Sequence, residues 1–142
     1  MEYHSQVKVT GIQHFPDGRE DCVEYITSGT LVSQPEGRFK LIYEEPANGE
    51  SDKVKTLVSV EGEKVTTHRW GEPEYKLEYE AGKVFEGLYK VPYGVWKIKI
   101  VTHNLEYNLT AHEGRIRLKY DLFIEGNNIS RNSMEIIIKE AH

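Results

Sequence analysis

The sequence contains a single cysteine, and this scarcity excludes several kinds of site. Cys22 has no partner for an internal disulfide, and a metal cluster built from cysteines cannot form. A chain without disulfides fits a reducing compartment. The first residues carry neither the basic start nor the apolar run of a secretion signal. We therefore expect a cytoplasmic protein.

The chain also lacks long apolar runs and an excess of basic residues. No stretch approaches the roughly 20 apolar residues that a membrane-spanning helix requires. The formal net charge is -5 over 142 residues, with acids and bases interspersed. Without a basic stripe we expect neither nucleic acid nor a membrane as a partner.

Motifs for known chemistries are missing as well. The sequence has no phosphate-cradling glycine loop, no serine nucleophile elbow and no zinc-protease motif. Its six histidines show no metal-ligand spacing. We therefore expect no cofactor and no metal, and we regard an enzyme as less favoured than a binding protein.

What the sequence does contain is period-two alternation of apolar and polar residues. Between Arg115 and Ile124 the even positions are apolar, whereas the odd positions are mostly charged. In a strand, this pattern places one row of side chains in a core and the other in water. Further strands are predicted over residues 6–15, 21–33, 39–43, 75–79, 96–100, 107–111 and 134–138.

Turn residues separate these segments at the spacing of an all-β fold. Asp17-Gly18, Glu61-Gly62 and Glu113-Gly114 are typical of tight turns between strands. Short connections favour an up-and-down barrel over a sandwich, since closure removes exposed sheet edges. We predict one all-β domain over residues 1–142, an antiparallel barrel of about ten strands.

Two details of this barrel are also predicted. Gly11 and Gly29 lie inside strands, where glycine suggests a bulge or bend. The polar segment Glu44–Lys53 contains Pro46 and Asn48-Gly49, which predicts a longer loop.

Several motifs occur together in an order typical of one family. They are Leu41-Ile42-Tyr43-Glu44-Glu45, Thr67-His68-Arg69-Trp70-Gly71, Tyr89-Lys90-Val91-Pro92-Tyr93-Gly94, then Thr102 and the strand from Gly114 to Tyr120. Over nearly the whole chain, the sequence resembles the YwiB-like family of small bacterial proteins. Val91 departs from the family, which more often carries Thr there. The resemblance implies a calycin-type barrel, similar in shape to lipocalins, and implies no activity.

Strand parity identifies polar residues that would face the barrel interior. Glu45 shares its parity with Tyr43, and Arg69 shares its parity with Thr67, so both charges would point inward and pair. A single bulge would exchange Glu45 for Glu44. The residues predicted to line a ligand site in the interior are Tyr43, Glu45, Arg69, Trp96, Thr102 and Tyr120.

The functional interpretation is a polar anchor within an apolar cup, in which Arg69 would grip a carboxylate or phosphate. Pro92, Tyr93 and Gly94 would then form a rim loop beside the cup, although such a triplet most often marks a tight turn. A small-molecule ligand is the favoured partner for a monomer or homodimer. The alternatives are a structural or interaction module with a filled interior, and an enzyme using Glu44 or Glu45 with Arg69.

Overall fold

The structure is a computed structural model that describes residues 2–45, 54–71 and 74–141. Its strands are β1 (Glu2–His14), β2 (Glu20–Gln34), β3 (Arg38–Glu45), β4 (Val54–Glu61), β5 (Lys64–Trp70), β6 (Glu74–Glu80), β7 (Val84–Val91), β8 (Gly94–Leu109), β9 (Gly114–Ile124) and β10 (Asn127–Glu140). A single 3-10 turn, Pro35–Gly37, is the only helical element of the described residues. Within the same ranges no helix is long and apolar enough to cross a membrane.

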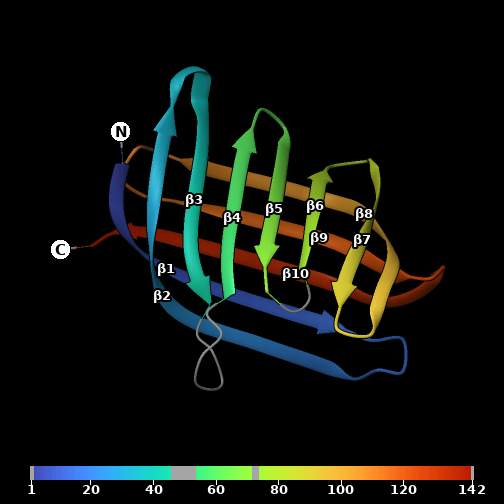
Figure 1. The fold of residues 1–142 in the computed structure, drawn as a ribbon. Coiled ribbons are helices and arrows are strands. Elements are labelled where there is room, and N and C mark those ends of the chain that lie inside the picture. The colour runs from blue at the N-terminus through green and yellow to red at the C-terminus, as the bar shows by residue number, and fades with distance from the viewer. Residues whose placement is uncertain (1, 46–53, 72–73, 142) are drawn as a thin grey trace.

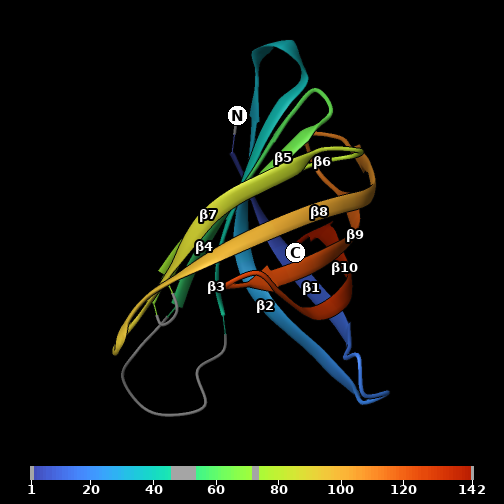
Figure 2. The same ribbon diagram turned by 90° about the vertical axis from the view of Figure 1, so that its right-hand side faces the viewer.

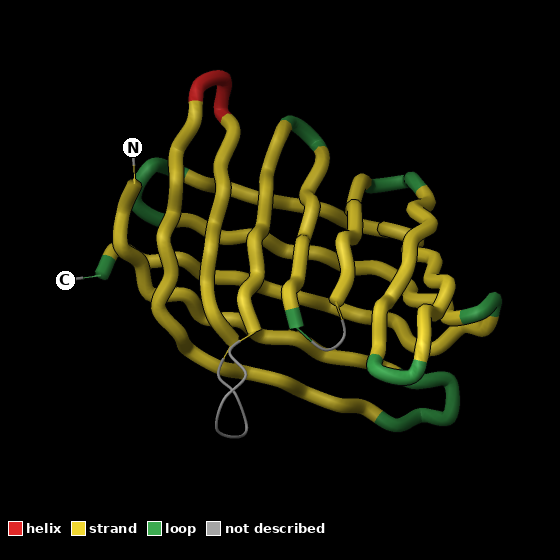
Figure 3. Tube along the Cα trace, viewed as in Figure 1, coloured by secondary structure: helices red, strands yellow, loops and turns green. Residues whose placement is uncertain are grey.

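Each strand pairs antiparallel with its neighbours in sequence, and β1 pairs with β10 to close the barrel (Figures 1 and 3). The predicted up-and-down barrel of about ten strands is therefore confirmed. In Figure 1, β3 to β7 run upright across the front, and β8 to β10 cross behind them. Figure 2 shows the β7–β8 and β1–β2 hairpins reaching past the lower end of the barrel on opposite sides.

The alternating apolar residues fill the barrel as the pattern predicts. On β9, Ile116 and Leu118 are buried, whereas Arg115 and Arg117 are exposed. The largest fully buried side chains come from strands all around the barrel: Leu31, Leu41, Leu77, Tyr79, Ile100, Ile116, Ile136 and Ile138. Burial of this apolar surface is the main source of stability for the fold.

Of the bulge or bend predicted at Gly11 and Gly29, the bulge is wrong, because pairing runs through both glycines without a shift. Irregularities lie instead between Thr102 and Asn104 on β8 and between Asn128 and Ser130 on β10. At Gly29 the backbone of β3 lies so close that a side chain has no room.

The predicted loop over Glu44–Lys53 begins later than expected. Strand β3 continues through Glu45, because Glu44 and Glu45 pair with Lys55 and Val54 of β4. Residues 46–53, with Pro46 and Asn48-Gly49, lie outside the described residues.

The barrel is least tightly paired between β6 and β7. Among the described residues, only Glu74 with Lys90 and Tyr75 with Tyr89 are partners there, whereas every other adjacent pair of strands shares at least six. The rings of Tyr75 and Tyr89 stack with their centres 5.0 Å apart. Closure at this seam therefore depends on aromatic contact as well as on backbone hydrogen bonds.

The two strand glycines give a matched test of this packing. A Cβ at Gly29 would lie 2.8 Å from the Ile42 carbonyl oxygen and 3.1 Å from Tyr43 Cβ, whereas one at Gly11 would contact nothing within 4 Å. We expect Gly29→Ala to lower the free energy of unfolding by about 2 kcal/mol. Gly11→Ala should leave it unchanged or raise it slightly. Equal effects of the two changes in urea unfolding would contradict the close approach.

Candidate functional site

Polar and aromatic side chains gather at one end of the barrel, where β3, β5 and β7 end and β4, β6 and β8 begin. This is the lower end in Figure 1, and we call it the mouth. The register places one inward-facing residue from each of six successive strands directly opposite the next: Tyr43, Thr56, Arg69, Tyr75, Tyr89 and Trp96. Opposite residues project from the same face of a sheet, so these side chains form a continuous row.

The structure brings Glu45 and Arg69 together in an ion pair at the mouth. Arg69 Nη2 lies 3.1 Å from Glu45 Oε2, and Arg69 Nε donates to the same oxygen over 3.3 Å. The hydroxyl of Thr56, on the strand between them, lies 3.5 Å from Glu45 Oε1. The Arg69 side chain is 14% exposed and that of Glu45 is 24% exposed. The pair is thus partly sheltered but within reach of solvent.

The parity of β3 decides which of its two terminal carboxylates enters the mouth. Glu44 is exposed on the outer face, opposite Lys55 in the register of β3 and β4, whereas Glu45 turns inward to Arg69. No bulge interrupts β3, so the two residues keep the faces that simple alternation assigns to them.

Six tyrosines surround and underlie the ion pair. Tyr25 of β2 and Tyr43 of β3 lie on one side of it, and the Tyr75–Tyr89 stack lies on the other. Deeper in the barrel, the rings of Tyr79 and Tyr120 meet at 5.0 Å and a tilt of 60°. Arg69 itself lies over Tyr75, with Cζ 5.9 Å from the ring centre.

Burial raises the pKa of all six tyrosines above its ordinary value. The Glu45 carboxylate further raises the pKa of Tyr25, and the neighbouring Tyr25 further raises the pKa of Tyr43. The cause is the cost of placing a phenolate in a low dielectric next to negative charge. At neutral pH these hydroxyls are uncharged donors and acceptors.

The remaining predicted interior residues lie at different depths. Thr102 is 2% exposed and sits opposite Tyr120 in the core. Trp96 has the inward parity of Ile98, but its side chain remains 44% exposed. The prediction that Trp96 lies inside the barrel is therefore wrong. The reason is its place at the start of β8, where the hairpin reaches beyond the packed part of the barrel. Trp96 therefore belongs to the edge of the mouth.

Pro92, Tyr93 and Gly94 form the turn of the β7–β8 hairpin. Tyr93 is 97% exposed, and Gly94 opens β8 with a φ of 150°, a conformation that favours glycine. The triplet therefore acts as a tight turn next to Trp96, and Tyr93 makes no wall of the mouth.

A second polar cluster, which the sequence reasoning missed, lies on the outer face beside the β8 bulge. Asp121 Oδ2 lies 2.9 Å from His103 Nε2, and Asp121 Oδ1 accepts from Arg131 Nε over 3.0 Å. Burial opposes ionisation of Asp121, but the hydrogen bonds from Arg131 and His103 outweigh it and lower the pKa of the carboxyl. The cluster joins the bulged residue of β8 to β9 and β10, which is a structural role.

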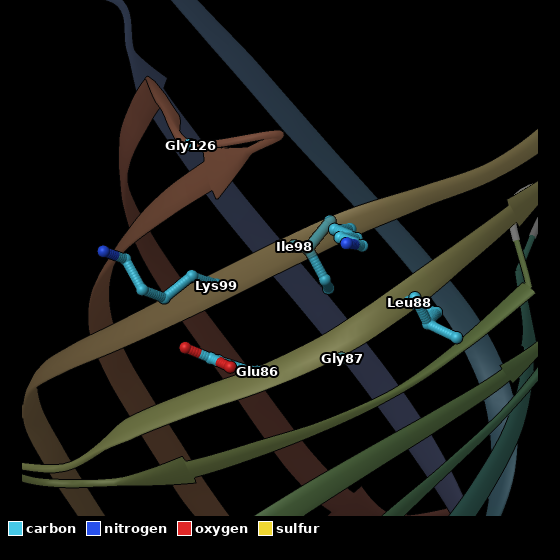
Figure 4. A pocket seen from close by; sticks show the side chains of 7 residues that line it. Glu86, Gly87, Leu88, Ile98, Lys99 and Gly126 are labelled. Atoms are coloured by element: carbon cyan, nitrogen blue, oxygen red, sulfur yellow. The ribbon is translucent and has the colours of Figure 1, made fainter.

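A depression of about 510 Å³ lies on the outer side of the β7–β8 hairpin (Figure 4). Glu86, Leu88 and Lys99 line it, with Gly126 of the β9–β10 turn at its border. Its walls are exposed strand faces, and none of the residues of the mouth contributes to it.

Four tyrosines of the mouth and core were absent from the predicted site: Tyr25, Tyr75, Tyr79 and Tyr89. For Tyr75 and Tyr79 the signal was present, because they alternate with Lys76 and Glu78 on one strand. Sequence alone does not show that tyrosines from β2, β6, β7 and β9 converge, since that depends on the curvature of the barrel.

Comparison with known proteins fits this architecture. A family model described as a domain of unknown function (DUF1934) matches residues 7–136. The chain belongs to this family. It is 27% identical over 120 residues to the uncharacterised β-barrel protein YwiB of Bacillus subtilis, covering 84% of this chain and 82% of that protein. The crystal structure of that ywiB protein superposes with a TM-score of 0.86 at 23% identity, covering 99% of this chain and 94% of the other. These matches support the fold and assign no activity.

Loss of the ion pair should destabilise the barrel. We expect Arg69→Met to lower the free energy of unfolding by about 2 kcal/mol, because it leaves a partly buried carboxylate without its partner. Lys90→Met is the control, since Lys90 and Glu74 form an exposed pair at 3.6 Å and should contribute less than about 0.5 kcal/mol. Urea unfolding measures both, and equal losses would show that the mouth pair is no stronger than a surface contact.

The tyrosine cluster predicts sensitivity to alkaline pH. An unfolded tyrosine titrates near pH 10, whereas these six have raised pKa values in the folded state. Their contribution to stability is therefore complete below about pH 10 and declines as the pH rises above it. Phenolate absorbance should show part of the nine tyrosines titrating only as the protein unfolds. Titration of all nine near pH 10 in a folded barrel would contradict the burial.

Proposed function

We propose that this protein binds a small molecule at the mouth of its barrel, in the manner of calycins and lipocalins. The observation that carries the proposal is the position of the Glu45–Arg69 pair, which is sheltered yet reachable by solvent within a wall of aromatic rings. Sites for small molecules combine apolar and aromatic walls with a few polar groups that orient the ligand.

The aromatic row favours a ligand with a planar ring. Tyr75, Tyr89 and Trp96 lie on three successive strands, and Trp96 is partly exposed at the outer end of the row. Rings of this kind bind a flat ligand by stacking or edge contact, with about 0.5–1.5 kcal/mol per aromatic pair beyond the area buried. The hydroxyls of Tyr25 and Tyr43 would then offer hydrogen bonds on the opposite side.

A second candidate function is an interaction module that uses the outer face of the β7–β8 hairpin. Leu88 is 50% exposed and Val95 is 54% exposed, and Leu88 borders the depression described above. Exposed apolar side chains next to a hollow are a feature of contact surfaces. This patch is small, which is why we favour the mouth.

A fragment screen tests the proposal. We expect planar fragments, detected by saturation-transfer NMR, to bind the wild-type protein and to lose at least about tenfold in affinity with Trp96→Ala, because that change removes the outer ring of the row. Tyr93→Ala is the matched control, since Tyr93 is an exposed aromatic three residues away that faces no part of the mouth. Fragments that bind all three proteins equally would place the binding elsewhere.

A further inference from the structure

We propose that the mouth selects ligands without net charge, because Glu45 already occupies the arginine that an anionic ligand would use. This inference rests on the proposed function and names the chemical class of its ligand. It also replaces the expectation that Arg69 grips a carboxylate or phosphate of the ligand.

In this pair, Glu45 occupies the position next to Arg69 that the carboxylate of an anionic ligand would take. Two nitrogens of Arg69, Nε and Nη2, point to the single oxygen Glu45 Oε2. A ligand carboxylate would have to displace a carboxylate that is tethered to the same barrel, and tethering gives a high effective concentration. Displacement would also leave Glu45, 24% exposed, next to a second negative charge.

A cationic ligand meets the opposite difficulty. Aromatic rings together with a carboxylate are the usual environment for binding a cation. Here that environment already holds the guanidinium of Arg69, over Tyr75 and against Glu45. A second cation would compete with Arg69 for Glu45, and the positive charge of Arg69 would repel it.

An uncharged polar ligand avoids both costs. Glu45 and Arg69 act on Tyr25 and on Tyr75 with charges of opposite sign, and Arg69 also acts on Tyr89. Among the residues that the structure describes, Glu45 Oε1 has only a long contact of 3.5 Å with Thr56, so it can accept a better hydrogen bond.

Three probes of one shape test this selectivity: uncharged 4-hydroxybenzamide, anionic 4-hydroxybenzoate and cationic 4-hydroxybenzamidine. Binding is followed at neutral pH by the NMR shift of the Trp96 indole N–H. Trp70 provides an internal reference, because it stacks on His68 on the outer face of β5. For the wild-type protein we expect the amide to bind at least about tenfold more tightly than either charged probe.

Variants of the pair should change the order of preference. Glu45→Gln removes the carboxylate that Arg69 Nε and Nη2 face and should make the benzoate the preferred probe. Arg69→Gln leaves Glu45 among the rings and should favour the benzamidine. Glu44→Gln removes the same charge from the outer face of β3 and should keep the wild-type order. Both changes remove the contact between the two side chains, and the wild-type order together with the order for Glu45→Gln decides the question.

The outcomes separate this inference from the proposed function. A wild-type preference for either charged probe, or an order that Glu45→Gln does not change, would overturn the charge selectivity while leaving a binding site at the mouth. If none of the probes shifts Trp96 in the wild-type protein or in the variants, the binding function of the mouth is itself contradicted. A preference for the amide that reverses with Glu45→Gln supports both.

Discussion

The ion pair between Glu45 and Arg69 is the constraint around which the mouth of this barrel is arranged. It joins β3 to β5 across the intervening strand β4, whose Thr56 lies beneath the carboxylate. A partly buried charge without a partner is costly, so the register of three strands must bring these two side chains together. A slip of one residue in any of them would leave a charge unpaired and turn core residues outward.

The aromatic side chains follow from the same constraint. A barrel interior that contains a salt bridge needs neighbours that are large and apolar yet able to hydrogen-bond, and tyrosine has both properties. Tyr75 covers the guanidinium of Arg69, and its stack with Tyr89 closes the weakly paired seam between β6 and β7. The mouth therefore combines an ion pair with aromatic rings and neutral hydroxyls. This combination is the basis for expecting an uncharged ligand.

Much of the fold could be predicted because alternation is a local property. Ile116 and Leu118 point inward because they alternate with charged residues along β9, and the inward direction of Glu45 and Arg69 follows from the same alternation. The position of a bulge and the depth at which a side chain is buried could not be predicted in this way, because they depend on where strands end and how they curve. The β8 bulge shifts the apolar parity between Ile100 and Leu105, and Trp96 is exposed because its hairpin outreaches the core. The alternation of residues along the strands does not indicate which ligand, if any, the barrel binds.

A double-mutant cycle on the mouth pair tests the central claim most directly. The free energies of unfolding of the wild-type protein, Glu45→Gln, Arg69→Met and the double variant give the coupling between the two side chains without counting their other contacts. A coupling of about 1 kcal/mol or more is predicted for a partly buried, hydrogen-bonded pair. A coupling near zero, with the effects of the two changes simply adding, would show that Glu45 and Arg69 do not depend on each other.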